Sequence, residues 1–130
     1  MTITETARSI SEVAEATGVS THTLRYYERE GLMLRPIDRA SSSHRRYTES
    51  DVTWVVFLTK LRRTSMSIAE MRAYAAYVRE GDQTVAERLQ LLLDHRAVVV
   101  AQLEEVTRSL AAIDFKIAAY SDQTIPQKAS

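Results

Sequence analysis

The sequence predicts a mainly α-helical fold with a helix-turn-helix unit, a short β-strand wing, two linking helices and one long C-terminal helix. Three observations support this prediction. Hydrophobic residues make up 45% of the 130 residues, and only 2 prolines and 3 glycines interrupt them. Three capping-box sequences each precede an apolar run of helical spacing. Apolar side chains then recur every three or four residues through the C-terminal part.

A chain of this length has room for one ordinary domain, or for a small domain with an extension. We expect a compact domain over residues 9–80 that contains the helix-turn-helix, the wing and the linking helices. A single long helix is expected over 82–120. The polar segment 121–130, which contains a proline, is expected to be a disordered tail.

The first two helices are short and are joined by a tight turn. The spacing of Ile10, Val13 and Ala14 predicts a helix that stops at Gly18. Ser20 is a suitable N-cap for a second helix that continues to about residue 30, where a glycine follows. Two short helices joined by a glycine-containing turn form the helix-turn-helix pattern.

The second helix contains two adjacent tyrosines, Tyr26 and Tyr27. Successive helical positions are about 100° apart, so the two rings cannot share one face. Tyr27 lies three residues after Leu24 and is expected to pack inward with it, while Arg25 and Tyr26 face outward. One tyrosine therefore belongs to the core, and its neighbour is available to a partner.

That outward face suits DNA. The second helix of a helix-turn-helix presents its N-terminal residues to base edges in the major groove. Arg25 can bind a phosphate through two N–H groups, and the Tyr26 hydroxyl can donate to another. The short polar residues suited to base or backbone contacts are Ser20, Thr21, His22 and Thr23. The chain is neutral overall, yet residues 20–63 carry nine Arg or Lys and five Asp or Glu, a local charge of +4.

The segment "LMLRPIDRASSSHRRY" is not helical in character. Its proline, serine run and scattered arginines favour short β pairing around a loop, which is a wing. Capping boxes then predict three further helix starts, at Thr48–Asp51, Ser67–Glu70 and Thr84–Glu87. The inward stripes of the first two of these helices are Val52, Val55, Leu58 and Leu61, and Ile68, Met71, Ala75 and Val78.

The last predicted helix carries a heptad seam of alternating steps of four and three over five repeats. The rest of the chain is too small to cover a seam along a helix this long. The simplest partner is a second copy of the chain. Arg96 is the one polar member of the seam. It either extends its charge to solvent where the apolar contact is narrow, or it sets the register across a dimer. The members are Val85, Leu89, Leu92, Arg96, Val99, Leu103, Val106, Leu110, Ile113, Ile117 and Tyr120.

The stretches "SISEVAEATGVSTHTLRYYEREGL", "RPIDRASSSHRRYTESDV" and "LRRTSMSIAEM", followed by the long helix, resemble the MerR family of bacterial transcription regulators over residues 9–120. The resemblance implies a winged helix-turn-helix fold and a homodimer held by an antiparallel coiled coil. It places Arg45, Arg46 and Tyr47 of the wing on DNA phosphates. It also implies a protein that distorts a pseudo-palindromic promoter so that RNA polymerase can engage it.

The chain departs from the family pattern at several positions. Ser43 and His44 stand where the family usually has Gly-Tyr, and Ser65 stands where glycine is common between the linking helices. The wing leans toward the aldehyde- and thiol-stress-sensing branch, whose members use a cysteine, but this chain has no cysteine. We do not expect the large C-terminal drug-binding domain of some relatives after the long helix.

Two further groups have two interpretations each. Arg62 and Arg63 either complement the helix dipole at a helix end or hold a phosphate. An apolar surface beside the third helix is either covered by a partner's coiled coil or lines a small effector pocket at the dimer junction. The pocket would be formed by Trp54, Phe57, Met66, Tyr74 and Tyr77.

The sequence argues against several other classes of protein. The three histidines are scattered, so a metal site is not expected, and no cofactor is predicted. No nucleophile–base pair or glycine-rich phosphate loop is visible, so an enzyme is not expected. Without a signal core or a membrane span, we expect a cytoplasmic protein. Two hypotheses are left: a homodimeric regulator that binds promoter DNA, and a module that sequesters a small hydrophobic compound, for which DNA binding is secondary.

Overall fold

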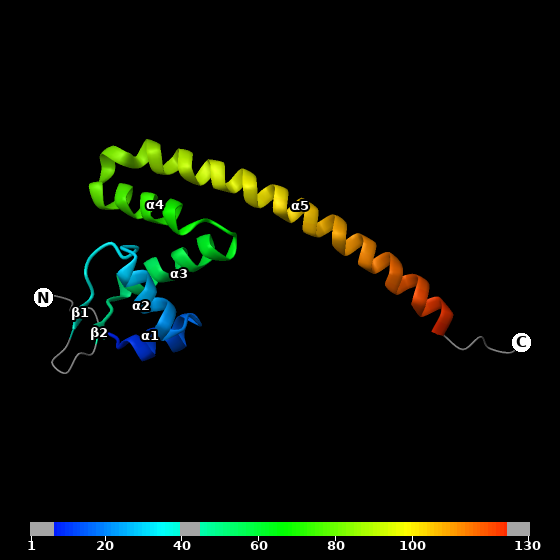
Figure 1. Ribbon diagram of the computed structural model, residues 1–130, viewed down its shortest axis with the longest axis horizontal. Coiled ribbons are helices and arrows are strands. Elements are labelled where there is room, and N and C mark those ends of the chain that lie inside the picture. Colours follow the sequence, from blue (N-terminus) through cyan, green and yellow to red (C-terminus); the bar gives the residue numbers. More distant parts are fainter. Residues whose placement is uncertain (1–6, 40–44, 125–130) are drawn as a thin grey trace, which may run out of the picture. The chain divides into compact units, whose positions relative to one another are not determined.

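The computed structural model describes residues 7–39 and 45–124. The chain forms two compact units, Met1–Leu91 and Leu92–Ser130. The first unit contains four α-helices with two short strands between the second and the third, as Figure 1 shows. The second contains most of the last helix. The predicted mainly α-helical class is confirmed.

The first helix ends at Gly18 and the second is capped by Ser20, as predicted, while the N-cap of the first helix was not identified from the sequence. Helix α1 (Ile10–Thr17) begins with a capping box, in which the Ser9 hydroxyl accepts from the Glu12 amide and the Glu12 carboxylate accepts from the Ser9 amide. It ends at Gly18, whose φ of 75° lies in the left-handed region that glycine adopts without strain. Helix α2 (Thr21–Arg29) follows after three residues and packs against α1. The predicted helix-turn-helix is therefore present.

Strands β1 (Asp38–Arg39) and β2 (Arg45–Arg46) form the predicted wing. They pair antiparallel, with Asp38 opposite Arg46 and Arg39 opposite Arg45. Ser43 and His44, where the sequence departs from the family pattern, lie outside the described residues. A third segment extends the pairing: the backbone of Arg8 exchanges two hydrogen bonds of 2.7 and 2.8 Å with that of Tyr47. The wing is thus joined to the segment before α1.

Helices α3 (Glu49–Arg63) and α4 (Ile68–Glu80) begin at Thr48 and Ser67, as predicted. Thr48 and Asp51 form the complete capping box, whereas the Ser67 hydroxyl accepts from the Glu70 amide and donates to its carboxylate. The turn between the helices contains Ser65 at a φ of 73°. This left-handed conformation explains why a glycine suits the position better than a serine does.

The start of the last helix differs from the prediction. Thr84 does not cap it, because the chain enters through a 3-10 turn, η1 (Asp82–Thr84), that begins after Gly81 at a φ of 98°. The Thr84 side chain is buried, and its hydroxyl donates to the carbonyl oxygens of Tyr77 and Gly81. The third predicted capping box is therefore wrong: inside this turn the hydroxyl is directed back toward α4 rather than toward the Glu87 amide.

The core of the first unit is formed by residues of α1, α2, α3 and α4, and in Figure 1 α3 lies between α4 on one side and α1 and α2 on the other. Most of the side chains predicted to face inward are buried, including Val13, Leu24, Val55, Leu58 and Met71. The turn that follows α2 also contributes to this core. Its members Leu32 and Met33 are buried.

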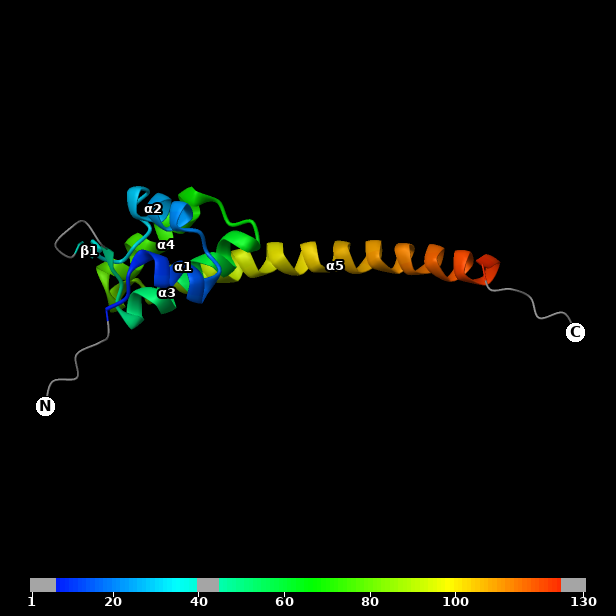
Figure 2. The ribbon, with the colours of Figure 1, turned by 90° about the horizontal axis from the view of Figure 1, so that it is seen from below.

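Helix α5 (Val85–Thr124) is a single helix of 40 residues, drawn without a break in Figure 2. It continues four residues beyond Tyr120, so Ser121–Thr124 are not part of a disordered tail as predicted. The sequence has no proline or glycine between Tyr120 and Thr124 that would end the helix earlier. Residues 125–130 lie outside the described residues. Within the described part of the chain, none of the helices is both long enough and apolar enough to span a bilayer.

Candidate nucleic-acid interface

The N-terminus of α2 is fixed by Ser20. Its hydroxyl oxygen accepts from the Thr23 amide at 3.1 Å, and its hydroxyl also lies 2.9 Å from the Thr23 hydroxyl. This N-cap satisfies one of the free amides that begin a helix and defines the direction in which the first turn points. Thr21, His22 and Thr23 follow in that turn.

Helix α2 has one buried face and one exposed face. Leu24 and Tyr27 are buried, and Tyr27 is only 4% exposed. Tyr26 is half-buried, with its ring centroid 6.4 Å from that of Tyr27. The predicted division between the two tyrosines is confirmed, because one packs in the core and its neighbour reaches the surface.

The exposed face is basic. His22, Arg25 and Arg29 are all exposed and follow one another at steps of three and four, so they form one stripe along α2. The sequence prediction omitted Arg29, although its spacing of four from Arg25 already indicated the shared face. A stripe with an imidazole and two guanidinium groups is well suited to the edges and phosphates of a duplex.

Charges at the end of α3 also act on α2. Burial raises the pKa of the Tyr27 phenol, and the positive charges of Arg62 and Arg63 partly offset this effect. Both arginines are exposed, as a phosphate contact requires. Arg62 has a structural contact as well, because its guanidinium donates to the Met66 carbonyl at 3.1 Å across the turn after α3.

In the wing, the structure separates residues that the family resemblance grouped together. Arg46 is exposed on β2, while the side chain of Arg45 lies outside the described part of the chain. Tyr47 has no exposed surface, and its hydroxyl donates to the carboxylate of Glu28. The prediction that the Tyr47 side chain contacts a phosphate is therefore wrong, because that side chain joins the wing to α2 inside the core.

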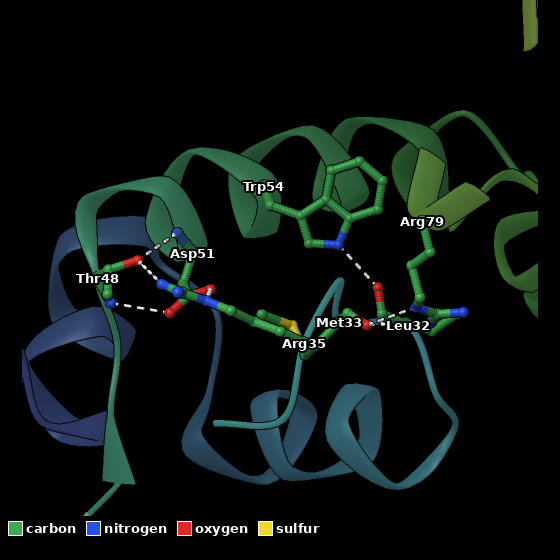
Figure 3. A network of polar contacts seen from close by, with 7 residues as sticks. All are labelled: Leu32, Met33, Arg35, Thr48, Asp51, Trp54 and Arg79. Carbon is green, nitrogen blue, oxygen red and sulfur yellow. Dashed lines mark hydrogen bonds and ion pairs between the residues drawn. The ribbon is translucent and has the colours of Figure 1, made fainter. Parts of the chain in front are cut away.

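A second polar contact lies where the wing begins. The Arg35 guanidinium donates to the Thr48 hydroxyl at 2.7 Å and forms an ion pair with Asp51 at 3.5 Å, as Figure 3 shows. Asp51 is buried and also completes the capping box of α3. The position of the wing is thus tied to the first turn of α3.

Three of the residues predicted to line an effector pocket contact one another within the chain. Trp54, Phe57 and Tyr74 pack on one another, and the rings of Trp54 and Tyr74 are stacked with centroids 5.8 Å apart and planes at 7°. Met66 has no exposed surface and belongs to the core. Tyr77 is half-buried. Within one chain these side chains pack in the first unit, and a pocket at the dimer junction stays a prediction.

Two cavities elsewhere in the described part of the first unit border the segment after α2. The larger, of about 320 Å³, is lined by Glu28, Gly31, Met33, Leu34, Arg35, Pro36, Ile37 and Arg79. The other, of about 280 Å³, is lined by Arg35, Pro36, Arg46, Thr48 and Asp51. No group of three or more His, Asp or Glu that could hold a metal ion occurs among residues 7–39 and 45–124.

Most of the seam of α5 is exposed within the chain, while Leu92 and Val99 are half-buried. Its exposed apolar members have between 53% and 63% of their surface accessible, and Arg96 is exposed as well. Another apolar side chain, Phe115, is 74% exposed but lies off the seam, which the heptad analysis did not identify. The exposed apolar seam members are Val85, Leu89, Leu103, Val106, Leu110, Ile113, Ile117 and Tyr120.

Comparison with known proteins gives a consistent result. Residues 8–78 match the family model described as MerR HTH family regulatory protein. An HTH-type transcriptional regulator of Haemophilus influenzae is 36% identical over 85% of this chain and 81% of its own length. The regulator AdhR of Bacillus subtilis is 40% identical over 68% of this chain, which spans 62% of AdhR.

Two solved structures share the fold over most of both chains. One is HiNmlR, a MerR family regulator lacking the sensor domain and bound to promoter DNA, with a TM-score of 0.80 and 33% identity over 90% of this chain and 92% of that one. The other is a MerR family transcriptional regulator from Listeria monocytogenes, with a TM-score of 0.80 and 37% identity over 92% and 89% of the two chains.

Proposed function

The chain belongs to the MerR family of helix-turn-helix regulatory proteins, and from this premise we propose that it is a homodimeric transcription regulator that binds promoter DNA in the cytoplasm. The family consists of regulators and not of enzymes. Sequestration of a hydrophobic compound as the main task has no support, because the relatives are regulators and the predicted pocket residues pack on one another.

The observation that carries the proposal is the exposed stripe on α2. His22, Arg25 and Arg29 face outward from a helix whose other face is buried. The position of α2 as second helix of a helix-turn-helix makes it the recognition helix, which enters the major groove. A solved relative of the same fold, HiNmlR, is bound to promoter DNA.

The side chains divide between two kinds of contact. The first-turn residues Thr21, His22 and Thr23 reach base edges, while Arg25, Arg29 and Tyr26 bind phosphates beside them. Ser20 orients the helix through its cap and presents backbone amides to the same surface. The wing adds Arg45 and Arg46 on a neighbouring phosphate, and Arg62 and Arg63 add positive charge at the end of α3.

The dimer is formed through the seam of α5. A row of apolar side chains over half exposed along one helix must be covered to be stable in water, and an identical helix offers a matching row. Two copies paired in antiparallel orientation then hold two recognition helices at a fixed separation. Such a dimer suits a pseudo-palindromic site. Arg96 in the seam either extends to solvent or sets the register of the pair.

By family resemblance, the dimer binds between promoter elements and distorts the DNA so that RNA polymerase engages both. Bending a site of this size costs on the order of a few kcal/mol, which the two recognition helices and wings must offset.

The test is a titration of the purified protein with two duplexes, one from the region directly upstream of its own gene and one of random sequence, at several salt concentrations. We expect tighter binding to the upstream duplex and a log–log slope of affinity against salt of about −0.9 for each phosphate contacted. A slope near zero, or equal affinity for both duplexes, would contradict the proposal.

A further inference from the structure

The turn that follows α2 is held in an unusual way. The four consecutive backbone carbonyls of residues 30–33 each accept a hydrogen bond from a side chain of α3 or α4. Carbonyls beyond the end of a helix have no partner within the helix and are otherwise left to water. Here two neighbouring helices supply the donors. We refer to Trp54, Arg72 and Arg79 as the carbonyl clamp.

The three donors divide the turn between them. Arg72 donates through Nε to the Glu30 carbonyl at 2.9 Å, and it also contacts the Glu30 carboxylate. The Trp54 indole N–H donates to the Leu32 carbonyl at 2.7 Å. Arg79 reaches the carbonyl of Gly31 and that of Met33, the latter at 3.0 Å. Figure 3 shows Trp54 and Arg79 pointing toward the turn from α3 and α4.

The clamp acts on a segment that is fixed on its other side as well. The side chains of Leu32 and Met33 are buried in the core. The turn is therefore held by these buried side chains and also by the hydrogen bonds to its carbonyls. Two residues later, Arg35 is bound to Thr48 and Asp51. The connection from the end of α2 to the wing is therefore attached to α3 and α4 at residues 30–33 and at Arg35.

The bonds from Trp54, and those from Arg79 to Met33, are partly buried and add to stability, but the contacts of Arg72 add little. Arg72 is about half exposed, and hydrogen bonds and ion pairs of exposed arginines contribute little to folding. The contacts do fix the orientation of α2 relative to α3 and α4. A helix of nine residues has little stability of its own and takes its orientation from what holds its ends.

We infer that Trp54, Arg72 and Arg79 are positioning residues for DNA recognition: they orient the recognition helix and the start of the wing relative to α3 and α4 without touching DNA. This inference rests on the proposed function. Helix and wing then approach the duplex as one preformed surface, which lowers the ordering cost of binding. If the turn were loosened, the phosphate contacts would still form, but the free-energy cost of aligning them on binding would be larger.

The test compares Arg79→Met, which keeps the apolar stem without its donors, and Trp54→Phe, which keeps a stacked ring without the N–H. The matched control is Arg88→Met. Arg88 donates to the Gly81 carbonyl at 2.6 Å and to the Thr84 hydroxyl, which is the same chemistry at the turn before α5. Each protein is titrated with the upstream duplex at several salt concentrations, and amide hydrogen exchange is followed at residues 31–34.

We expect Arg79→Met and Trp54→Phe to weaken binding about tenfold, as the loss of one or two net hydrogen bonds does, with an unchanged salt slope. Exchange at residues 31–34 should become faster, while Arg88→Met should bind as the unaltered protein does. Unchanged affinity with faster exchange would overturn the inference, and a slope reduced by about 1 for each copy would mean that Arg79 contacts a phosphate directly. If Arg88→Met weakened DNA binding equally, the effect would come from a general loss of stability, and the inference would be wrong. If the unaltered protein shows no salt-dependent preference for the upstream duplex, the proposed function itself fails.

Discussion

The phenol of Tyr47, directly after strand β2, donates a hydrogen bond to the carboxylate of Glu28 in α2. Tyr47 is fully buried, so this contact joins the wing to the recognition helix from inside the core. It complements the carbonyl clamp, which holds the same helix at the turn that follows it. The wing and α2 are therefore joined directly by this hydrogen bond, and both are also held by contacts with α3 and α4.

Tyr47→Phe should lower the free energy of unfolding by about 1–3 kcal/mol, because it removes a donor to a charged, half-buried carboxylate while it keeps the ring. Urea unfolding followed by circular dichroism measures the change. Tyr26→Phe removes a phenol at the surface of α2 and, in the absence of DNA, should change stability by less than about 0.5 kcal/mol. Equal stability of Tyr47→Phe and the unaltered protein would rule out a stabilising role for this bond.

The capping box of α1 should make stability depend on pH. The hydrogen bond from the Ser9 amide, and then that from the Ser9 hydroxyl, hold the pKa of Glu12 below its usual value. A lowered pKa in the folded protein stabilises it above the unfolded pKa, and this contribution is lost as pH falls through the folded value. Glu12→Gln should therefore have a lower Tm than the unaltered protein at neutral pH, and the difference should shrink on acidification.

The measurement is Tm by circular dichroism between about pH 3 and about pH 7, the range in which carboxyl groups titrate. Ser9→Ala is the matched control. It keeps the backbone amide that lowers the pKa most, so it should be less stable at every pH while it retains much of the pH dependence. A difference between Glu12→Gln and the unaltered protein that stays constant over this range would contradict the linkage.

Arg25→Ala should weaken binding to all duplexes, because a phosphate contact carries no sequence information. The salt slope should fall by about 0.9 for each copy, hence by about 1.8 for a dimer. Arg108→Ala removes the same charge from an exposed position in the second unit, where Arg108 pairs with Glu105. That control should leave the slope unchanged, and if it lowers the slope equally, net charge rather than a contact is responsible.

His22→Ala should act differently from Arg25→Ala. His22 is exposed in the first turn of α2, where side chains reach base edges, so its loss should relax the preference at particular base pairs by about 1–3 kcal/mol. Competition among duplexes with single base-pair substitutions measures this preference. An unchanged preference, with affinity lowered evenly, would assign His22 to the phosphates.

Leu103→Asp should dissociate the proposed homodimer. Leu103 lies near the middle of the seam, so in an antiparallel pair it meets its own counterpart, and two carboxylates would then face each other in an apolar contact. Sedimentation velocity at about micromolar concentration, a range in which many protein pairs associate, should show a monomer. Phe115→Ser, on the same helix but off the seam, should stay dimeric, and its dissociation would place the contact on another face of α5.

Local patterns in the sequence predicted most of the fold. Helix starts at Ser20, Thr48 and Ser67 depend on residues three apart, so caps and periodicity identify them without tertiary information. The Ser9 box has the same spacing, although the sequence analysis did not name it. Thr84 has the same local pattern, but the backbone at Gly81 forms a 3-10 turn that uses its hydroxyl as a donor. A pattern of residue types does not distinguish a hydroxyl that accepts from one that donates.

The positioning of α2 could not be predicted in this way. Arg72 and Arg79 lie 42 to 48 residues from the carbonyls they bind, and no local spacing relates them to the turn. Tyr47 shows the opposite error. It follows two arginines in sequence and was grouped with them, whereas its hydroxyl has a buried partner 19 residues earlier. Which face a residue presents depends on the tertiary structure around it.

Trp54 gives the protein an intrinsic optical reporter. It is the only tryptophan in the chain, and its indole is both stacked on Tyr74 and bound to the Leu32 carbonyl. The emission of an indole depends on its hydrogen bonding and on the polarity around it. Fluorescence of the unlabelled protein should therefore follow movement at the junction of three helices, during unfolding or on a duplex, without any dye or inserted residue.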